Sequence, residues 1–447
     1  MPPAGPGRRL RGAYFGWYMI VAATVANLVM GAGLVGSLAG VFLEPMTADL
    51  GWSRAEFIVS FTTGQFVTAA TALVIGGYLD RRGGRRLMLV GTSITVVALL
   101  LTAEVRELWQ WVLLRGVIQP IGLGMAGSLV VNVTLAKWFV RYRGRAIGIA
   151  ACGFSLAGII VPNTLTPVVD AYGWEAGWRV LAVAAALLIY PASLMMRRQP
   201  EDYGLRPDGR TDDTPGGSAA AERERFDYAT SLTRREALGT GALWLLAVAF
   251  GTVGLMLLGL VTQAIPLLTD AGFSRPTAAA MLAVLTVPGL LSRPFWGVAA
   301  ERVDPRRLAA AAFLGVGTGV LIIVLGARAQ SLPIVALGFF AMGSGMAGYV
   351  PVQEIMWAGF FGRRHLGAVR SSAMPITVVL GALGPVLVAS YYDRAGSYDG
   401  ILVVISALVI ANAALVFFAR RPARRERGDG RAAAPGRGEG AGTAGGP

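Results

Sequence analysis

Long apolar runs separated by short charged or Gly- and Pro-rich breaks constrain this chain more than any other feature. A helix needs about 20 apolar residues to cross a hydrocarbon layer about 30 Å thick, and runs of that length recur throughout the sequence. They predict an all-α membrane protein with twelve membrane-spanning helices, at residues 14–41, 55–79, 87–103, 108–136, 146–169, 177–196, 240–268, 277–300, 307–327, 331–360, 366–391 and 399–419. Only 15% of the residues are charged, against roughly 25% in a soluble domain.

The net charge of +14, from 40 basic and 26 acidic residues, would by itself also suit a nucleic-acid partner. The positions of the basic residues decide between the two explanations. With both termini in the cytoplasm, most basic residues fall in cytoplasmic segments. The six in external loops are Arg54, Arg106, Arg179, Arg275, Arg328 and Arg394. This is the positive-inside bias, and it predicts a multi-pass protein of the cytoplasmic (inner) membrane, with both termini cytoplasmic and no nucleic-acid partner.

Several classes of protein are excluded by single residues. One cysteine, Cys152, and one histidine, His365, leave no disulfide framework and argue against a His/Cys metal site. The only lysine, Lys137, is followed by Trp138, so the phosphate-binding pattern GxxxxGK[ST] is absent. No candidate nucleophile has a base beside it in the sequence. We therefore expect no metal, no cofactor, no ATP-driven step and no enzymatic activity.

Several motifs recur at one constant offset of 221 residues. The segment PMTADLGWSR matches PLLTDAGFSR, and the charged turn GYLDRRGGRR at 77–86 has a weaker copy in GVAAERVDPRR at 297–307. The offset aligns Asp80 with Glu301, and Asn132 with Gln353. A constant offset across separate motifs indicates a duplication, so we expect two pseudo-symmetric six-helix halves.

The repeat also divides the chain into segments. The predicted segments are a cytoplasmic N-terminal segment at 1–13, a first half at 14–196, a cytoplasmic linker at 197–238, a second half at 239–420 and a disordered cytoplasmic tail at 421–447. The linker and the tail are charged or Gly-rich with little apolar periodicity, as in disordered segments. Duplicated six-helix halves are a transporter architecture, in which the substrate binds near the midplane and rocking of the halves gives alternating access.

The turn GGYLDRRGGRR resembles the signature between the second and third helices of the major facilitator superfamily, and Arg115 with GVIQPIGLG resembles its fourth helix. The likeness covers all twelve spans and implies the major facilitator fold. In that superfamily the acid and the arginines of the signature lock the two halves together at the cytoplasmic face. The gating residues implied here are Asp80, Arg81, Arg85, Arg86, Arg115, Glu301 and Arg302. The alternative, that these arginines only set topology, would leave the two acids unexplained.

A narrower resemblance is to the monocarboxylate porters and the oxalate/formate exchangers. The stretch KWFVRYRGRAIGIAACGFSLAG is similar to their fifth helix, FGW to their first, and SRPFWG to an eighth-helix pattern. This resemblance makes Arg293 the residue that binds the substrate carboxylate. Two positions differ: Gly289 replaces the acid one turn earlier in proton-coupled animal members, and Ser37 replaces the first-helix lysine. Proton coupling by that route is therefore not implied.

Ionisable residues inside a span are costly, so they are functional candidates by default. The directions of the helices and a rise of 1.5 Å per residue place Arg293, Glu354 and Arg370 at similar depth, where they could share a cavity. Two arginines and one acid would leave a net positive site suited to a carboxylate. The full candidate set for substrate binding is Arg293, Arg370, Glu354, Asn132, Gln353 and Asn27. Static ion pairs and interhelical hydrogen bonds are the alternatives.

These features predict a secondary active transporter that moves a small organic anion, preferably a monocarboxylate, by alternating access. Its expected partners are that anion, a proton as the candidate co-substrate, and membrane lipid, and we expect a monomer. An exporter of hydrophobic or drug-like compounds is the alternative within transport, since it would not need Arg293. A non-transporting membrane receptor of the same fold is the alternative from another class. It would be expected to carry an added signalling domain, which neither the linker nor the tail resembles.

Overall fold

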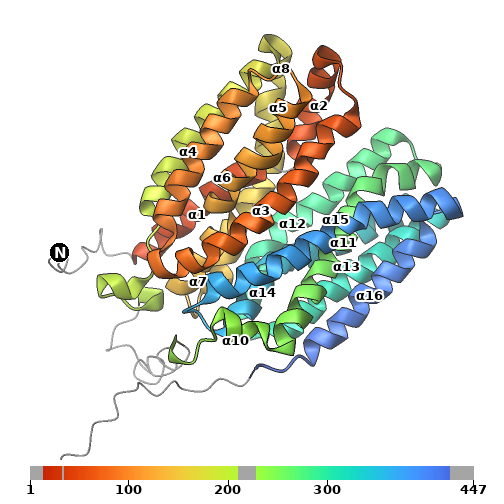
Figure 1. Ribbon diagram of the computed structural model, residues 1–447. Helices are drawn as coiled ribbons and strands as arrows, with labels where there is room; N and C mark the ends of the chain where they lie inside the picture. Colours follow the sequence, from red (N-terminus) through yellow and green to blue (C-terminus); the bar gives the residue numbers. More distant parts are fainter. Residues whose placement is uncertain (1–13, 33–34, 210–227, 423–447) are drawn as a thin grey trace, which may run out of the picture.

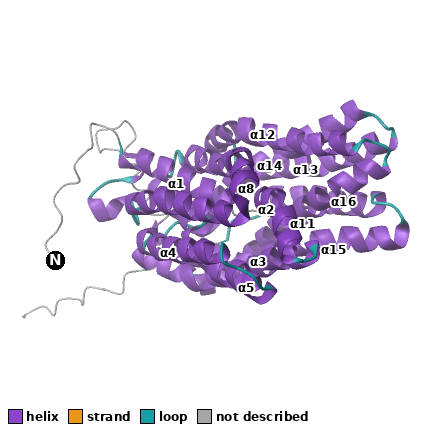
Figure 2. Cartoon of the chain, turned by 90° about the horizontal axis from the view of Figure 1, so that it is seen from above, coloured by secondary structure: helices purple, strands orange, loops and turns teal. Residues whose placement is uncertain are grey.

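The computed structural model describes residues 14–32, 35–209 and 228–422. The predicted N-terminal segment 1–13, the middle of the predicted linker and nearly all of the predicted tail 421–447 lie outside the described residues. The side chain of Ser37 also lies outside them. Within the described ranges all regular structure is helical (Figure 2), which confirms the predicted all-α fold class.

The helices of the first half are α1 (Phe15–Ala32), α2 (Val35–Leu50), α3 (Arg54–Arg82), α4 (Gly84–Thr102), α5 (Leu108–Leu113), the π-helical turn η1 (Leu114–Ile118), α6 (Gln119–Ala126), α7 (Ser128–Trp138) and α8 (Arg143–Met195). Two short 3-10 turns follow, η2 (Pro200–Tyr203) and η3 (Pro207–Gly209). The second half holds α10 (Arg234–Leu238), α11 (Gly241–Asp270), α12 (Arg275–Arg302), α13 (Pro305–Arg328), α14 (Leu332–Phe361), α15 (Leu366–Ala395) and α16 (Asp399–Phe417).

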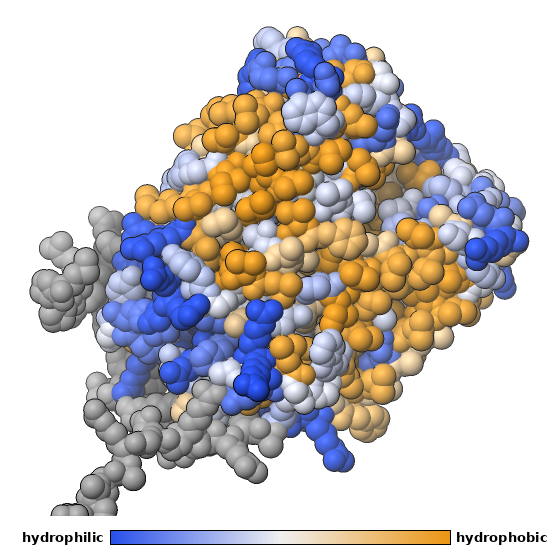
Figure 3. All heavy atoms as spheres, viewed as in Figure 1, coloured by the Kyte–Doolittle hydropathy of each residue, from blue (hydrophilic) through white to orange (hydrophobic). Residues whose placement is uncertain are grey.

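Ten of the described helical segments are long and apolar enough to cross a membrane, if the run from α5 to α7 is taken as one segment. One of them, α8, has 53 residues and a break at Gly173, where φ is 84°, so it makes two crossings of about 20 residues or more. With the α1–α2 pair added, these elements account for the twelve predicted spans. Figure 3 shows a hydrophobic belt between more hydrophilic ends of the molecule, as a membrane-spanning bundle requires.

The helices form two bundles, one from each half, that lie side by side (Figure 1). They meet most closely at one end of the molecule, where α3, α7, α12 and α14 end and α4, α8 and α15 begin. Residues 197–209 and 228–233 also lie at this end, so we call it the linker end. The bundles diverge toward the opposite end, called here the far end (Figure 1). Between the halves, α3 packs against α15 and α8 packs against α12.

The repeated motif PMTADLGWSR/PLLTDAGFSR has a local structural reason. Gly51 and Gly272 have φ of 69° and 94°, a left-handed conformation that glycine adopts at little cost. Two residues later, Ser53 and Ser274 are the N-caps of α3 and α12, and each side chain accepts a hydrogen bond from the backbone N–H three residues on. Such caps satisfy N–H groups that a helix start leaves unpaired. The motif therefore starts the equivalent helix in each half.

Glycines allow neighbouring helices within each half to approach closely. A Cβ added at Gly91 of α4 would lie 2.6 Å from the backbone oxygen of Gly122 and 2.7 Å from Cβ of Met125, both on α6. Small residues at such crossings are typical of membrane helix pairs. In the second half, a Cβ at Gly319 would lie 2.9 Å from the Gly338 oxygen, so α13 and α14 are packed in the same way.

We expect Gly91→Ala to lower the melting temperature of the detergent-purified protein, because forcing a methyl group into a packed crossing costs about 1–3 kcal/mol. Gly158 on α8 provides the control, since a Cβ there would meet nothing within 4 Å. Gly158→Ala should leave the melting temperature unchanged or slightly raised, because alanine favours a helix over glycine by about 1 kcal/mol. Equal effects of the two substitutions would contradict the packing described here.

Candidate functional site: a closed contact between the halves and a buried polar cluster

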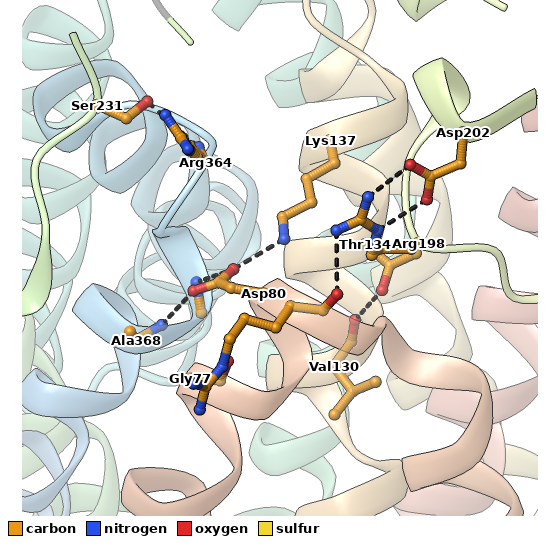
Figure 4. Close-up of polar contacts among 12 residues, drawn as sticks. Gly77, Asp80, Val130, Thr134, Lys137, Arg198, Asp202, Ser231, Arg364 and Ala368 are labelled. Carbon is orange, nitrogen blue, oxygen red and sulfur yellow. Dashed lines mark hydrogen bonds and ion pairs between the residues drawn. The ribbon is translucent and has the colours of Figure 1, made fainter. Parts of the chain in front are cut away.

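The carboxylate of Asp80 joins the two halves at the linker end (Figure 4). Its Oδ1 accepts hydrogen bonds from Lys137 Nζ at 2.8 Å and from the backbone N–H of Gly367 at 3.0 Å. Its Oδ2 accepts one from the backbone N–H of Ala368 at 2.8 Å. Asp80 and Lys137 belong to the first half, whereas the two backbone donors begin α15 of the second. A carboxylate is favoured there, because a helix start presents free N–H groups and a positive dipole end.

This set of contacts, here called the latch, is buried. The side chains of Asp80 and Lys137 are each only 4% exposed. Lys137 was not among the residues that the sequence assigned to the gate. The available signal was that the only lysine of the chain directly follows the fourth predicted span, beside a basic loop.

The arginines of the signature do not pair with Asp80. Arg81 donates from Nε to the Gly77 oxygen of its own helix at 3.2 Å. Arg81, Arg85 and Arg86 are exposed, and none of them makes a salt bridge with a carboxylate in the described part of the chain. The structure therefore separates the acid of the charged turn from the arginines that surround it in sequence.

The repeat provides a second contact between the halves at the same end. Glu301, which the offset aligns with Asp80, lies in the last turn of α12 and pairs with Arg145 Nη2 at 2.9 Å. Arg145 lies in the first turn of α8. We call this pair the second latch. In each case an acid at the end of a helix in one half contacts the start of a helix in the other half. Arg302, also assigned to the gate, is exposed.

Two pairs of glycines bring the backbones of the halves together beside the latches. A Cβ added at Gly76 of α3 would lie 2.6 Å from the oxygen of Gly367 on α15, and one added at Gly367 would lie 2.7 Å from the oxygen of Gly76. On the other side, a Cβ at Gly297 of α12 would lie 2.6 Å from the oxygen of Gly144 on α8. No other residue fits such contacts without displacement of the backbone, so the linker end is closed.

The described parts of the linker pack onto this closed end. Arg198 donates from Nη1 to the Arg81 oxygen at 3.0 Å and bonds to Asp202 through Nε at 2.7 Å (Figure 4). The hydrogen bonds that Arg198 donates to the Asp202 carboxylate raise the pKa of Arg198. Glu201 forms a salt bridge with Arg363 of the second half at 2.7 Å. The linker thus contacts both halves where they meet.

A buried polar cluster lies between the halves, farther from the linker end. Glu354 Oε1 accepts hydrogen bonds from Arg370 Nε at 3.3 Å and from Asn132 Nδ2 at 3.5 Å. The Arg370 guanidinium lies over the ring of Trp357 at 5.5 Å. Gln353 adjoins Glu354 and interacts with Tyr349. We call Asn132, Gln353, Glu354, Trp357 and Arg370 the central cluster; all five are buried.

The central cluster has unused hydrogen-bonding capacity. Glu354 Oε2, Trp357 Nε1 and Arg370 Nη1 are buried and have no hydrogen-bond partner among the described residues. Leaving such a group unpaired costs about 1–3 kcal/mol, and more if it is charged. Gln353 Nε2 is unpartnered as well, so three donors and one acceptor are available to a ligand or to water. A guanidinium and an indole N–H are suited to the oxygens of a carboxylate.

The remaining predicted substrate residues contact α8 instead. Arg293 donates from Nη1 to Ser155 Oγ at 2.8 Å and to the backbone oxygen of Ala151. Within the described residues, no hydrogen bond or ion pair joins Arg293 to Glu354 or Arg370. Asn27 donates to the Ala150 oxygen at 2.9 Å. Of the three intramembrane ions expected to share a cavity, two are thus paired directly, while Arg293 spans from α12 to α8.

Arg115 lies in neither the latch nor the central cluster. Its guanidinium packs on the rings of Phe61, Trp178 and Trp111, at 4.9, 5.0 and 5.7 Å from the ring centroids. All three rings belong to the first half. The π-helical turn η1 begins one residue before it. Cation–π contacts of this kind stabilise a desolvated guanidinium by about 2 kcal/mol.

A model of the Major Facilitator Superfamily matches residues 25–290 and 255–441 of this chain. The chain belongs to the major facilitator superfamily. Its members are transporters and not enzymes, so the protein is a multi-pass membrane transporter of this superfamily. The resemblance drawn from the charged turn and the repeat is confirmed at this level.

Two bacterial relatives are similar over most of their length. The gallate transporter of Pseudomonas putida is 25% identical over 78% of this chain and 79% of that protein. The oxalate:formate antiporter of Oxalobacter formigenes is 22% identical over 84% of this chain and 85% of that protein. The proton:xylose symporter XylE superposes with a TM-score of 0.69 at 16% identity, over 90% of this chain and 94% of that one. That likeness shows the fold.

Other relatives match over a shorter region. MFS-type transporter 1 of Ophiocordyceps sp. is 29% identical over 43% of this chain. The chain spans 42% of that relative's length in this match. Similarity of this extent supports the family and leaves the substrate open.

We expect the latch to behave as a coupled buried ion pair. Removing one charge from such a pair costs about 3–5 kcal/mol, because it strands the other in the interior. Asp80→Asn and Lys137→Met should each lower the stability by about that amount, and the double variant should lose much less than the sum. Denaturant unfolding in detergent measures the three values.

The exposed pair Arg179–Glu104, with side chains 54% and 62% exposed, is the matched control for this cycle. Arg179→Met and Glu104→Gln should each cost about 1 kcal/mol or less. Additive losses for Asp80→Asn and Lys137→Met would contradict a buried, mutually dependent pair.

Proposed function

We propose that this protein is a secondary active transporter of small organic anions, that carboxylate substrates bind at the central cluster, and that monocarboxylates are preferred. The observation that carries the proposal is the Glu354–Arg370 pair with its unpartnered donors, Arg370 Nη1 and Trp357 Nε1, in the buried space between the halves. The similarity to an oxalate:formate antiporter and a gallate transporter, both named for carboxylates, supports the substrate class.

The contacts of Glu354 suggest how a substrate would act. In the structure, Glu354 is the partner of Arg370 and also accepts a hydrogen bond from Asn132 of the first half. A substrate carboxylate would replace Glu354 on Arg370 and use the free Nη1 donor. The displaced Glu354 would then lack a cation partner in a buried place, which is costly for a carboxylate. Substrate binding would therefore weaken its link to Asn132, and Glu354, the one acid of the central cluster, is the proposed carrier of a co-transported proton.

The state of the latches supports an assignment of the conformation. The linker end is closed by Asp80, Glu301 and the glycine contacts, and the halves diverge toward the far end (Figure 1). In an alternating-access cycle this corresponds to a site reached from the far end. Opening the linker end would require both latches to break. Asp80 and Glu301 are therefore proposed as gating residues, with Lys137 and Arg145 as their partners.

The distribution of arginines supports a cytoplasmic linker end. Arg81, Arg82, Arg85 and Arg86 all lie there, and all four are exposed. Basic residues are enriched in the cytoplasmic loops of membrane proteins. The far end would then face the cell exterior, and both termini would be cytoplasmic in the inner membrane.

Uptake of labelled carboxylates into liposomes tests the substrate site. The panel is formate, oxalate, lactate, pyruvate and gallate, each with and without an imposed pH gradient. For the acid that is transported, Arg370→Gln should lower uptake about 10- to 100-fold, because a hydrogen bond to a charged group contributes about 1.5–3 kcal/mol. Glu354→Gln should remove the response to the pH gradient. Arg394→Gln, at an exposed residue of the far end, is the control. Full uptake by Arg370→Gln would contradict the assigned site.

The single thiol of the chain can report on the gate. Cys152 lies on α8 and is half-buried, beside the Ala151 oxygen that Arg293 contacts. A side chain at Gly144 would press against the backbone of α12. Gly144→Val should therefore hold the linker end open and raise the rate at which an impermeant thiol reagent on the linker side modifies Cys152. Gly158→Val, on the same helix in open space, should leave that rate unchanged. Equal rates in all three proteins would contradict the assigned gate.

A further inference from the structure

A surface groove lies beside the latch, on the outside of the first half. It has a volume of about 420 Å³. Its lining residues are Tyr78, Arg86, Leu87, Leu89, Val90 and Met125. These come from the end of α3, the start of α4 and the end of α6. Apart from Arg86 and the hydroxyl of Tyr78, the lining is apolar.

The groove opens onto the surface that faces lipid. Val90, 51% exposed, begins a line of exposed residues along α4 that continues through Ser93, Val97 and Leu101. Residues spaced three or four apart lie on one face of a helix. A hydrocarbon chain seated in the groove could therefore continue along α4 within the hydrophobic belt (Figure 3).

Two arginines lie at the end of the groove nearest the linker end. Arg86 precedes Val90 by one helical turn and forms part of the wall. Arg82 lies over the ring of Tyr78 at 5.7 Å. Neither arginine makes a salt bridge with any described carboxylate, because Asp80, the nearest acid in sequence, is held by Lys137 and α15. The groove thus combines an apolar wall with two cations at one end that make no salt bridge among the described residues.

We propose that this groove binds one anionic phospholipid. The headgroup phosphate would pair with Arg86 and Arg82, and one acyl chain would pack on Tyr78, Leu89 and Val90. Basic pockets between membrane helices suit anionic headgroups, and each arginine near the surface contributes about 1 kcal/mol. The inference does not depend on the transported substrate. It gives Arg82 and Arg86 a role separate from the latch, since Asp80 is the residue of the charged turn that belongs to the latch.

Native mass spectrometry of the full chain tests this inference, with phosphatidylglycerol and phosphatidylcholine of identical acyl chains as the probes. We expect the wild-type protein to retain one phosphatidylglycerol in preference to phosphatidylcholine. Arg86→Gln should weaken that binding about fivefold, and Arg82→Gln/Arg86→Gln about 25-fold, from about 1 kcal/mol per arginine. Val90→Trp should also weaken it by filling the groove.

Arg85→Gln is the matched control. Arg85 is an exposed neighbour of Arg86 with no described salt bridge, and it does not line the groove. It should change phosphatidylglycerol binding by less than twofold, and every variant should keep the wild-type melting temperature in detergent. Equal losses for Arg85→Gln and Arg86→Gln would overturn the proposal in favour of diffuse attraction to a basic surface. Competition by inorganic phosphate alone would overturn it in favour of a free-anion site. Equal binding of the two lipids would overturn it as well.

Discussion

The closed end of this transporter depends on which groups donate hydrogen bonds to one buried carboxylate, that of Asp80. A charged group removed from water must be fully paired, or its desolvation outweighs its attractions. Asp80 meets that requirement with one ammonium group and two backbone N–H groups at the start of α15. Because two of these three donors belong to the other half, the carboxylate is fully satisfied only while the halves are together. The glycines at 76 and 367 follow from the same requirement, since only their missing side chains let α15 come close enough.

The central cluster also has an acid with partners from both halves, but its hydrogen bonds are only partly made. Glu354 also has partners from both halves, Arg370 and Asn132, yet one of its oxygens and one Arg370 nitrogen remain unpaired. A carboxylate whose hydrogen bonds are all made, such as Asp80, stabilises the one arrangement of the halves in which they form. A group with hydrogen bonds still unmade, such as Glu354 or Arg370, favours binding of a ligand that supplies the missing partners. The difference between the two sites therefore lies in how many of their hydrogen bonds the protein itself supplies.

Much of the fold follows from local patterns in the sequence. Apolar length located the spans, and the constant offset located the duplication and paired Asp80 with Glu301. Contacts between distant segments were harder to predict. Lys137 lies 57 residues from Asp80, and no local pattern pairs a lone lysine with one acid rather than another. Depth placed Arg293, Glu354 and Arg370 at one level but gave no information on which way each side chain points around its helix. That rotation directs the Arg293 side chain of α12 toward α8 and away from the pair.

The two latches differ in their exposure to solvent. Both side chains of the Asp80–Lys137 pair are nearly inaccessible, whereas Arg145 in the second latch is 37% exposed. Dissolved ions screen the second pair and hardly reach the first. Higher ionic strength would therefore weaken the Arg145–Glu301 pair more than the Asp80–Lys137 pair. When both latches break, the α8/α12 side would then yield before the α3/α15 side.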